Sequence, residues 1–168
     1  MVISIIYLIF SFLLDNFMSN IFSSTLSNIS YFTTIYIVIS FVILYSYFSN
    51  ERKYYLLLII FGLLFDILYT GTFVFNMTLF FVIGIVIKML NNVFPENIFT
   101  INLISVIVIS LYHLLSFIIL SLVSGTHYEF ILLINIITHS IISTVIYTSV
   151  SYFVMKFIFE KFNVKQIK

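Results

Sequence analysis

The chain has 168 residues, of which 62% are hydrophobic and 8% are charged, and its net charge is +1. A soluble domain carries about 25% charged residues, so this composition excludes an ordinary water-soluble protein. The near-neutral charge also leaves no basic surface for nucleic acid. Because the chain contains no cysteine, it has neither a disulfide framework nor a thiolate metal site. We therefore expect an all-α integral membrane protein surrounded by the lipid bilayer.

Six apolar stretches follow one another and predict a single transmembrane domain with six spans. A helix of about 20 residues crosses the roughly 30 Å hydrocarbon core. The spans are expected at about 2–21, 31–48, 54–69, 73–89, 98–123 and 130–155. The stretches are apolar throughout, which favours a helical bundle over a barrel of alternating strands. The two halves share no evident motif, so no internal repeat is predicted.

The positions of the basic residues predict the orientation. All lie between spans two and three, at the end of span four, or after span six: Arg52, Lys53, Lys88, Lys156, Lys161, Lys165 and Lys168. Since Lys and Arg gather on the cytoplasmic side, both termini should be cytoplasmic. The chain lacks Ala and Trp and is rich in Ile, Phe and Asn, which is typical of an AT-rich genome. The expected location is therefore a bacterial plasma (inner) membrane, and close helix packing should use Ser, Thr and the few glycines.

Two carboxylates inside predicted spans, Asp66 and Asp15, are the strongest candidates for a functional site. An ionisable group costs at least a few kcal/mol in a span, so it is a functional candidate by default. Asp66 lies roughly 18 Å from the cytoplasmic start of span three, and Asp15 lies at a similar depth in span one. Gly62 precedes Asp66 by one turn on the same face and would let another helix approach with a hydrogen-bond partner. The alternative for both carboxylates is contact with outer headgroups or with neighbouring Ser and Thr.

Span six carries a polar ridge at four-residue spacing, made by Asn135, His139, Ser143, Tyr147 and Ser151. Such a row follows one side of a helix. It predicts hydrogen bonding between helices in the bundle core, and the alternative is the lining of a solute or proton path. His113 in span five is interpreted in the same way, as a buried core histidine.

Known catalytic patterns are missing from the sequence. There is no His-Glu-x-x-His zinc helix and no phosphate-binding glycine loop. Phe65 precedes Asp66 where an intramembrane aspartyl protease would have glycine, and Leu122 stands where a serine protease motif would start. We therefore expect no enzyme activity, no metal and no cofactor.

The segment 62–71, Gly-Leu-Leu-Phe-Asp-Ile-Leu-Tyr-Thr-Gly, resembles the rod shape-determining protein MreD family. In that family the third span ends in a Gly-x-x-x-Asp element, followed by a short glycine turn and an apolar fourth span. Gly62, Asp66 and Gly71 match this pattern, whereas Phe75-Asn76 stands where the family often has a further glycine. The six-span layout and the basic tail extend the resemblance in pattern over nearly the whole chain.

The resemblance implies a structural role in the bacterial elongation machinery. MreD-like proteins associate with the bitopic protein MreC and through it with MreB, the peptidoglycan synthase RodA and its transpeptidase. They are thought to share a fold with the substrate-binding subunits of ECF-type vitamin transporters. The resemblance carries over no catalytic residues, so Gly62, Asp66, Gly71 and Asp15 would be structural or partner-docking residues.

Two other functions remain open at this point. The chain could itself be a vitamin-binding ECF subunit, although such subunits often have alanine-rich motifs in the first span and this chain has Ser4 and Ser11 there. It could also be a proton-coupled transporter that uses Asp66 and His139, although no repeat or broken helix is evident.

Overall fold

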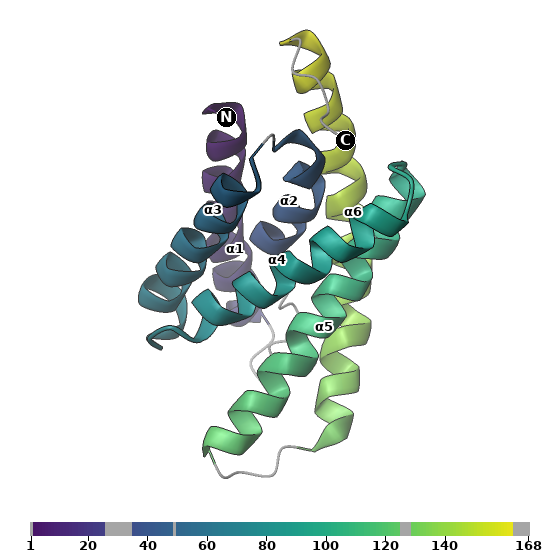
Figure 1. Cartoon of the computed structure of the whole chain (residues 1–168). Coiled ribbons are helices and arrows are strands. Elements are labelled where there is room, and N and C mark those ends of the chain that lie inside the picture. The colour runs from purple at the N-terminus through teal and green to yellow at the C-terminus, as the bar shows by residue number, and fades with distance from the viewer. Residues whose placement is uncertain (1, 26–34, 49, 125–128, 163–168) are drawn as a thin grey trace.

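The computed structural model describes residues 2–25, 35–48, 50–124 and 129–162, and these are all-helical, without strands (Figure 1). The helices are α1 (Val2–Thr25), α2 (Tyr36–Leu44), α3 (Glu51–Phe65), α4 (Phe75–Val93), α5 (Ile98–Ser124) and α6 (Phe130–Lys161). A 3₁₀ turn, η1 (Tyr45–Tyr47), extends α2, and a π-helical turn, η2 (Asp66–Thr70), extends α3. These elements lie at the six predicted positions; residues 31–34 of the expected second span lie outside the described residues.

Four helical stretches are long and apolar enough to cross a membrane. They are Glu51–Thr70, Phe75–Val93, Ile98–Val123 and Phe130–Lys161. Val2–Met18 and Tyr36–Tyr47 are shorter apolar helices. The architecture is thus that of an all-α membrane protein.

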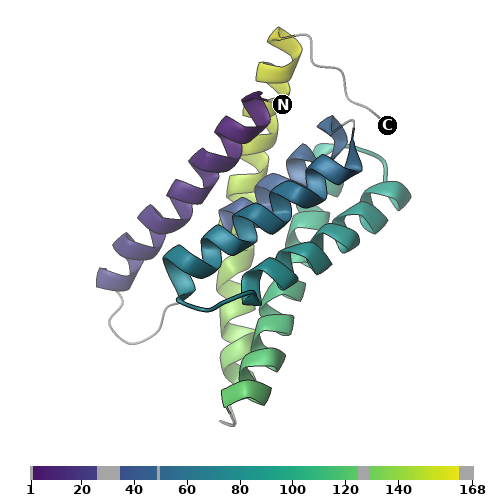
Figure 2. The same ribbon diagram turned by 60° about the vertical axis from the view of Figure 1, so that its left-hand side comes forward.

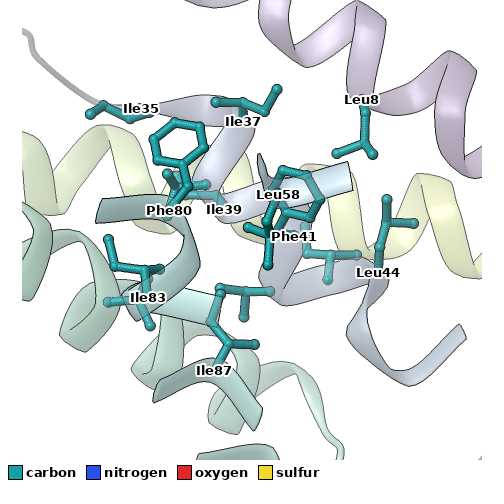
Figure 3. Close-up of a cluster of buried hydrophobic side chains, with 14 of the residues drawn as sticks. Leu8, Ile35, Ile37, Ile39, Phe41, Leu44, Leu58, Phe80, Ile83 and Ile87 are labelled. Atoms are coloured by element: carbon teal, nitrogen blue, oxygen red, sulfur yellow. The ribbon is translucent and has the colours of Figure 1, made fainter. Parts of the chain in front are cut away.

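The short helix α2 forms the centre of the molecule. All its residues from Ile37 to Leu44 are buried. A helix that is apolar all round must be covered by other elements, and here α1, α4, α5 and α6 pack around it. Figure 3 shows its side chains among those of α3 and α4, with Leu58, Phe80, Ile83 and Ile87 next to Ile37, Ile39, Phe41 and Leu44. The stretch Tyr36–Tyr47 is only about 18 Å long, so it spans little more than half of a roughly 30 Å hydrocarbon core.

Small hydroxyl side chains are buried inside the bundle beside its apolar core, and the outer faces expose large apolar side chains. Hydroxyl groups are fully buried at Ser11, Ser40, Ser105, Ser140, Thr144 and Thr148. The outer faces of α1 and α6 instead expose side chains such as Phe10, Leu13, Ile142 and Phe153. Small hydroxyl residues allow close helix packing where alanine is absent, so this distribution fits a protein whose solvent is lipid.

Both ends of the described chain lie at the same end of the bundle (Figures 1 and 2). The α5–α6 hairpin extends beyond the other helices at the opposite end in both views. At the first end, Lys88 Nζ of α4 lies 2.7 Å from Glu51 Oε2 of α3. Because successive helices run in opposite directions, the basic residues of α3, α4 and α6 lie at the end where the described chain begins and ends.

Candidate functional site

The carboxylate of Asp66 caps the start of α4. Its Oδ1 accepts a hydrogen bond from the backbone N–H of Asn76 at 2.8 Å, and its Oδ2 accepts one from the N–H of Met77 at 3.1 Å. N–H groups in the first turn of a helix have no partner within the helix. The N-cap residue of α4 is Val74, whose apolar side chain cannot accept a hydrogen bond. Asp66 therefore performs from α3 the task of an N-cap side chain, and its negative charge is favourable at the positive end of the α4 dipole.

Side chains complete the surroundings of Asp66 and connect three helices. Its Oδ1 also accepts hydrogen bonds from Thr72 Oγ1 at 2.6 Å and from Asn76 Nδ2 at 2.9 Å. Asn76 is fully buried, and the Tyr112 hydroxyl of α5 donates to its Oδ1. A buried carboxylate needs several such donors to offset the loss of water. The network thus joins the end of α3, the start of α4 and the middle of α5.

Gly62 allows α4 to reach the carboxylate. A Cβ atom on Gly62 would lie 2.7 Å from Met77 Cα and 2.9 Å from the Asn76 carbonyl oxygen. Both contacts involve backbone, which cannot move away as a flexible side chain could. The spacing Gly-x-x-x-Asp therefore has one physical meaning here: the glycine admits the first turn of α4, and the aspartate one turn later binds that turn.

The connection between α3 and α4 is tight and strained. Gly71 has a φ of 62°, which glycine adopts at little cost. Val74 has a φ of 69°, a region that β-branched residues rarely adopt. The hydrogen bonds of Asp66 to the residues that follow Val74 hold this conformation in place.

Asp15 does for α2 what Asp66 does for α4. Its Oδ1 accepts a hydrogen bond from the N–H of Tyr36 at 2.7 Å, and its Oδ2 accepts one from the N–H of Ile37 at 3.1 Å. The N-cap residue of α2, Ile35, has no polar side chain. Among the described residues, the backbone of the central helix thus supplies two hydrogen-bond donors to Asp15.

The two capping aspartates end segments of similar sequence. Residues 9–15, Ile-Phe-Ser-Phe-Leu-Leu-Asp, and residues 60–66, Ile-Phe-Gly-Leu-Leu-Phe-Asp, are identical at four of seven positions. Each segment ends in the aspartate that caps the next helix, and each has a small residue one turn earlier, Ser11 or Gly62. The caps span 21 residues in the first case and 10 in the second. The similarity of the two segments can be read from the sequence, but that each aspartate caps the next helix is visible only in the structure.

The polar ridge of α6 is divided by the structure. The Tyr147 hydroxyl lies 2.8 Å from Ser11 Oγ, and Ser40 Oγ donates to Ser11 Oγ at 2.6 Å, so α1, α2 and α6 meet there. Ser151 is buried, Asn135 is partly buried and His139 is exposed. Ser143 Oγ donates to the Ser140 carbonyl of its own helix. The row that faces the core is displaced by one residue and consists of Ser140, Thr144, Thr148 and Tyr152.

The predicted core histidine of α5 is buried. His113 is 8% exposed and its ring lies 5.7 Å from that of Tyr112, edge to face.

The chemistry of these sites is that of helix positioning. The oxygens of both carboxylates accept hydrogen bonds from backbone N–H groups. A transported solute or substrate would have to displace these N–H groups in order to bind either carboxylate. Within the described part of the chain, no group of three or more His, Cys, Asp or Glu residues could hold a metal ion. Sequence reasoning missed Asn76, Thr72, Tyr112 and Ser40, since a polar residue within an apolar run does not show which helix it faces. The one available signal was the short distance along the chain between Asp66 and Asn76.

The fold and these sites define a polytopic helical membrane protein in which buried carboxylates hold the starts of neighbouring helices. Comparisons with protein-family models, with curated proteins and with solved structures gave no match to this chain.

Proposed function

We propose that the protein is an integral membrane component of the bacterial elongation (rod) complex that contributes to cell shape by docking an MreC-like bitopic protein. Through that partner it would act on MreB, RodA and its transpeptidase. The observation that carries this proposal is the shared use of Gly62 and Asp66, the residues that resemble the MreD element. Both act on the first turn of α4, which supports a structural role for the element rather than a catalytic one.

The proposed mechanism is docking of a partner's transmembrane helix on an apolar outer face. Between helices in lipid there is little hydrophobic driving force, so association depends on close fit and on hydrogen bonds. A close fit requires a surface of constant shape. The Gly62 contact and the Asp66 cap hold α3 and α4 together, and the Tyr112–Asn76 bond attaches this pair to α5.

The proposal includes six spans with both termini in the cytoplasm. The chain has no cysteine, so single-cysteine variants can be labelled without background. In intact cells a membrane-impermeant maleimide should label Glu129→Cys, at the start of α6, and should label Lys53→Cys only after the membrane is opened. The reverse pattern would show that the orientation is wrong.

Cell shape tests the role directly. Depletion of the gene in its host should turn rods into rounded cells, and the detergent-solubilised protein should co-purify with an MreC-like partner. Complementation by Asp66→Leu should be impaired, whereas complementation by the neighbouring control Ile67→Leu should be normal, because Ile67 is 57% exposed and makes no part of the cap. Normal rods after complete depletion would refute the proposal.

A further inference from the structure

The α3–α4 pair is short for a structure that crosses a membrane. The ion pair between Lys88 and Glu51 marks one end of both helices. At the other end the chain turns at Thr70 and Gly71, which are exposed, and no regular helix follows until α4 begins. Exposed irregular backbone does not occur within the hydrocarbon of a bilayer, so this turn must lie at the membrane surface. From Lys53 to Thr70 the helix rises by at most about 26 Å, and any tilt lowers this height.

The α5–α6 hairpin is much longer. The segment 98–123 of α5 contains no charged residue, and a helix of this length rises about 38 Å. In α6 no Asp, Glu, Lys or Arg occurs between Phe130 and Lys156, which are about 39 Å apart along the helix. The apolar length of the hairpin therefore exceeds that of the α3–α4 pair by about 12 Å.

Contacts between the two parts show where the extra length lies. Ser46 of η1 donates a hydrogen bond to Glu96 at 2.7 Å, so the end of η1 is level with the start of α5. The Tyr112 hydroxyl donates to Asn76, so the α3–α4 turn is level with the middle of α5. Beyond Tyr112, α5 continues to Ser124 for about 18 Å. This is the part of the hairpin that extends past the other helices (Figures 1 and 2).

The extending part of the hairpin has an apolar outer surface. Leu122 and Val123 of α5 are 79% and 80% exposed, and Ile131 and Ile134 of α6 are also exposed. Large apolar side chains are favourable in lipid and unfavourable in water. The α3–α4 turn thus requires the membrane surface at a level where the neighbouring hairpin requires hydrocarbon.

We propose that the protein holds the bilayer thin beside α3 and α4, so that this face binds phospholipids with shorter acyl chains than the face of α5 and α6 does. A span shorter than the roughly 30 Å hydrocarbon core is accommodated by thinning of the adjacent bilayer. The Tyr112–Asn76 hydrogen bond fixes the short pair against the long hairpin, so one bilayer thickness does not fit both. The occupant of the α3–α4 face is therefore lipid of reduced thickness.

Quenching of tryptophan fluorescence by brominated lipids tests this inference. The chain contains no tryptophan, so Ile60→Trp in α3 and Ile146→Trp in α6, which replace exposed side chains, each report on the lipid at one face. Each purified full-length variant is reconstituted into dioleoylphosphatidylcholine mixed with brominated phosphatidylcholine of myristoleoyl, oleoyl or erucoyl chain length. At Ile60→Trp the shortest lipid should bind at least about two-fold more strongly than the oleoyl lipid, because the cost of mismatch increases with the difference in length. At Ile146→Trp the shortest lipid should bind no more strongly than the oleoyl lipid.

Two outcomes of the quenching assay would overturn the inference. The same order of chain lengths at both reporters would show that the bilayer has one thickness around the protein. Absence of quenching at Ile60→Trp by every lipid would show that protein, such as a second copy of this chain, covers the α3–α4 face. Gel filtration and circular dichroism establish that each variant is folded.

The accessibility of spin labels gives an independent measurement of the two levels. The chain has no cysteine, so Phe73→Cys in the turn and Ile118→Cys in the extending part of α5 can each carry a single label. A water-soluble nickel complex should reach the label at Phe73, whereas oxygen dissolved in lipid should be the more effective relaxant at Ile118. Nickel access at both labels would place the hairpin in water, and access at neither would place the turn in hydrocarbon; either result refutes the inference. Neither assay involves cell shape, so its failure leaves the proposed function standing.

Discussion

Replacement of Asp66 by leucine should destabilise the protein by at least about 2 kcal/mol. The substitution keeps a side chain of similar size but removes four hydrogen bonds of 3.1 Å or less, from Thr72, from Met77 and from the backbone and side chain of Asn76. The backbone N–H groups of Asn76, which is buried, and of Met77, which is partly buried, would lose their acceptor, at about 1–3 kcal/mol each or about 2–6 kcal/mol together. The average of about 0.6 kcal/mol per hydrogen bond measured in a membrane protein gives about 2.4 kcal/mol for four bonds. The two estimates agree on the lower limit.

Unfolding in mixed micelles with increasing dodecyl sulfate measures the total change, and hydrogen–deuterium exchange locates it. Exchange of the Asn76 and Met77 amides should become faster in Asp66→Leu, and Asp66→Asn, which keeps one acceptor oxygen, should lie between it and the wild type. Ile67→Leu is the control at a lipid-facing neighbour. A free energy of unfolding within about 0.5 kcal/mol of the wild type is what a surface substitution gives, and with unchanged exchange at both amides it would refute the capping role of Asp66.

Three other substitutions test the geometry around the two caps. Gly62→Ala should lower the free energy of unfolding by about 1–3 kcal/mol, because its new methyl group meets backbone atoms. The control Gly84→Ala should lower it by less, because its methyl group meets the end of a leucine side chain. Equal losses of unfolding free energy in chemical unfolding would contradict this. Val74→Gly should raise the unfolding free energy by up to about 1 kcal/mol, since glycine tolerates the positive φ; a loss of stability would show that this φ is not strained. Asp15→Asn should speed amide exchange at Tyr36 and at the residue after it, and slow or unchanged exchange there would remove Asp15 from the cap of α2.

Particular residues show how far sequence reasoning reaches. The cost of placing a carboxylate in lipid directs attention to Asp66 and Asp15, and the spacing of Gly62 and Asp66 places these two residues on one face of a helix. The backbone N–H donors to these carboxylates were not predictable, because every residue except proline carries such a group and the residue type does not show which one will donate. The ridge of α6 shows the opposite error: a four-residue spacing tells which residues share one side of a helix, but it does not tell which side faces the core. The buried row is Ser140, Thr144, Thr148 and Tyr152, one residue later at each step. The predicted ridge lies beside this row: Tyr147 contacts Ser11, whereas His139 is exposed.

The sequence by itself determined the class of protein, its helical architecture and the approximate helix positions. These follow from composition, because a chain with so few charges is stable only in lipid, where every backbone group must find its partner within a helix. Only the tertiary structure decided that α2 lies at the centre and that each buried aspartate caps the helix that follows it. The same applies to the similarity of the two caps, which lies in matching hydrogen bonds across connections of different length. Such relations depend on which surfaces meet in three dimensions, and an apolar stretch of sequence does not specify its neighbour.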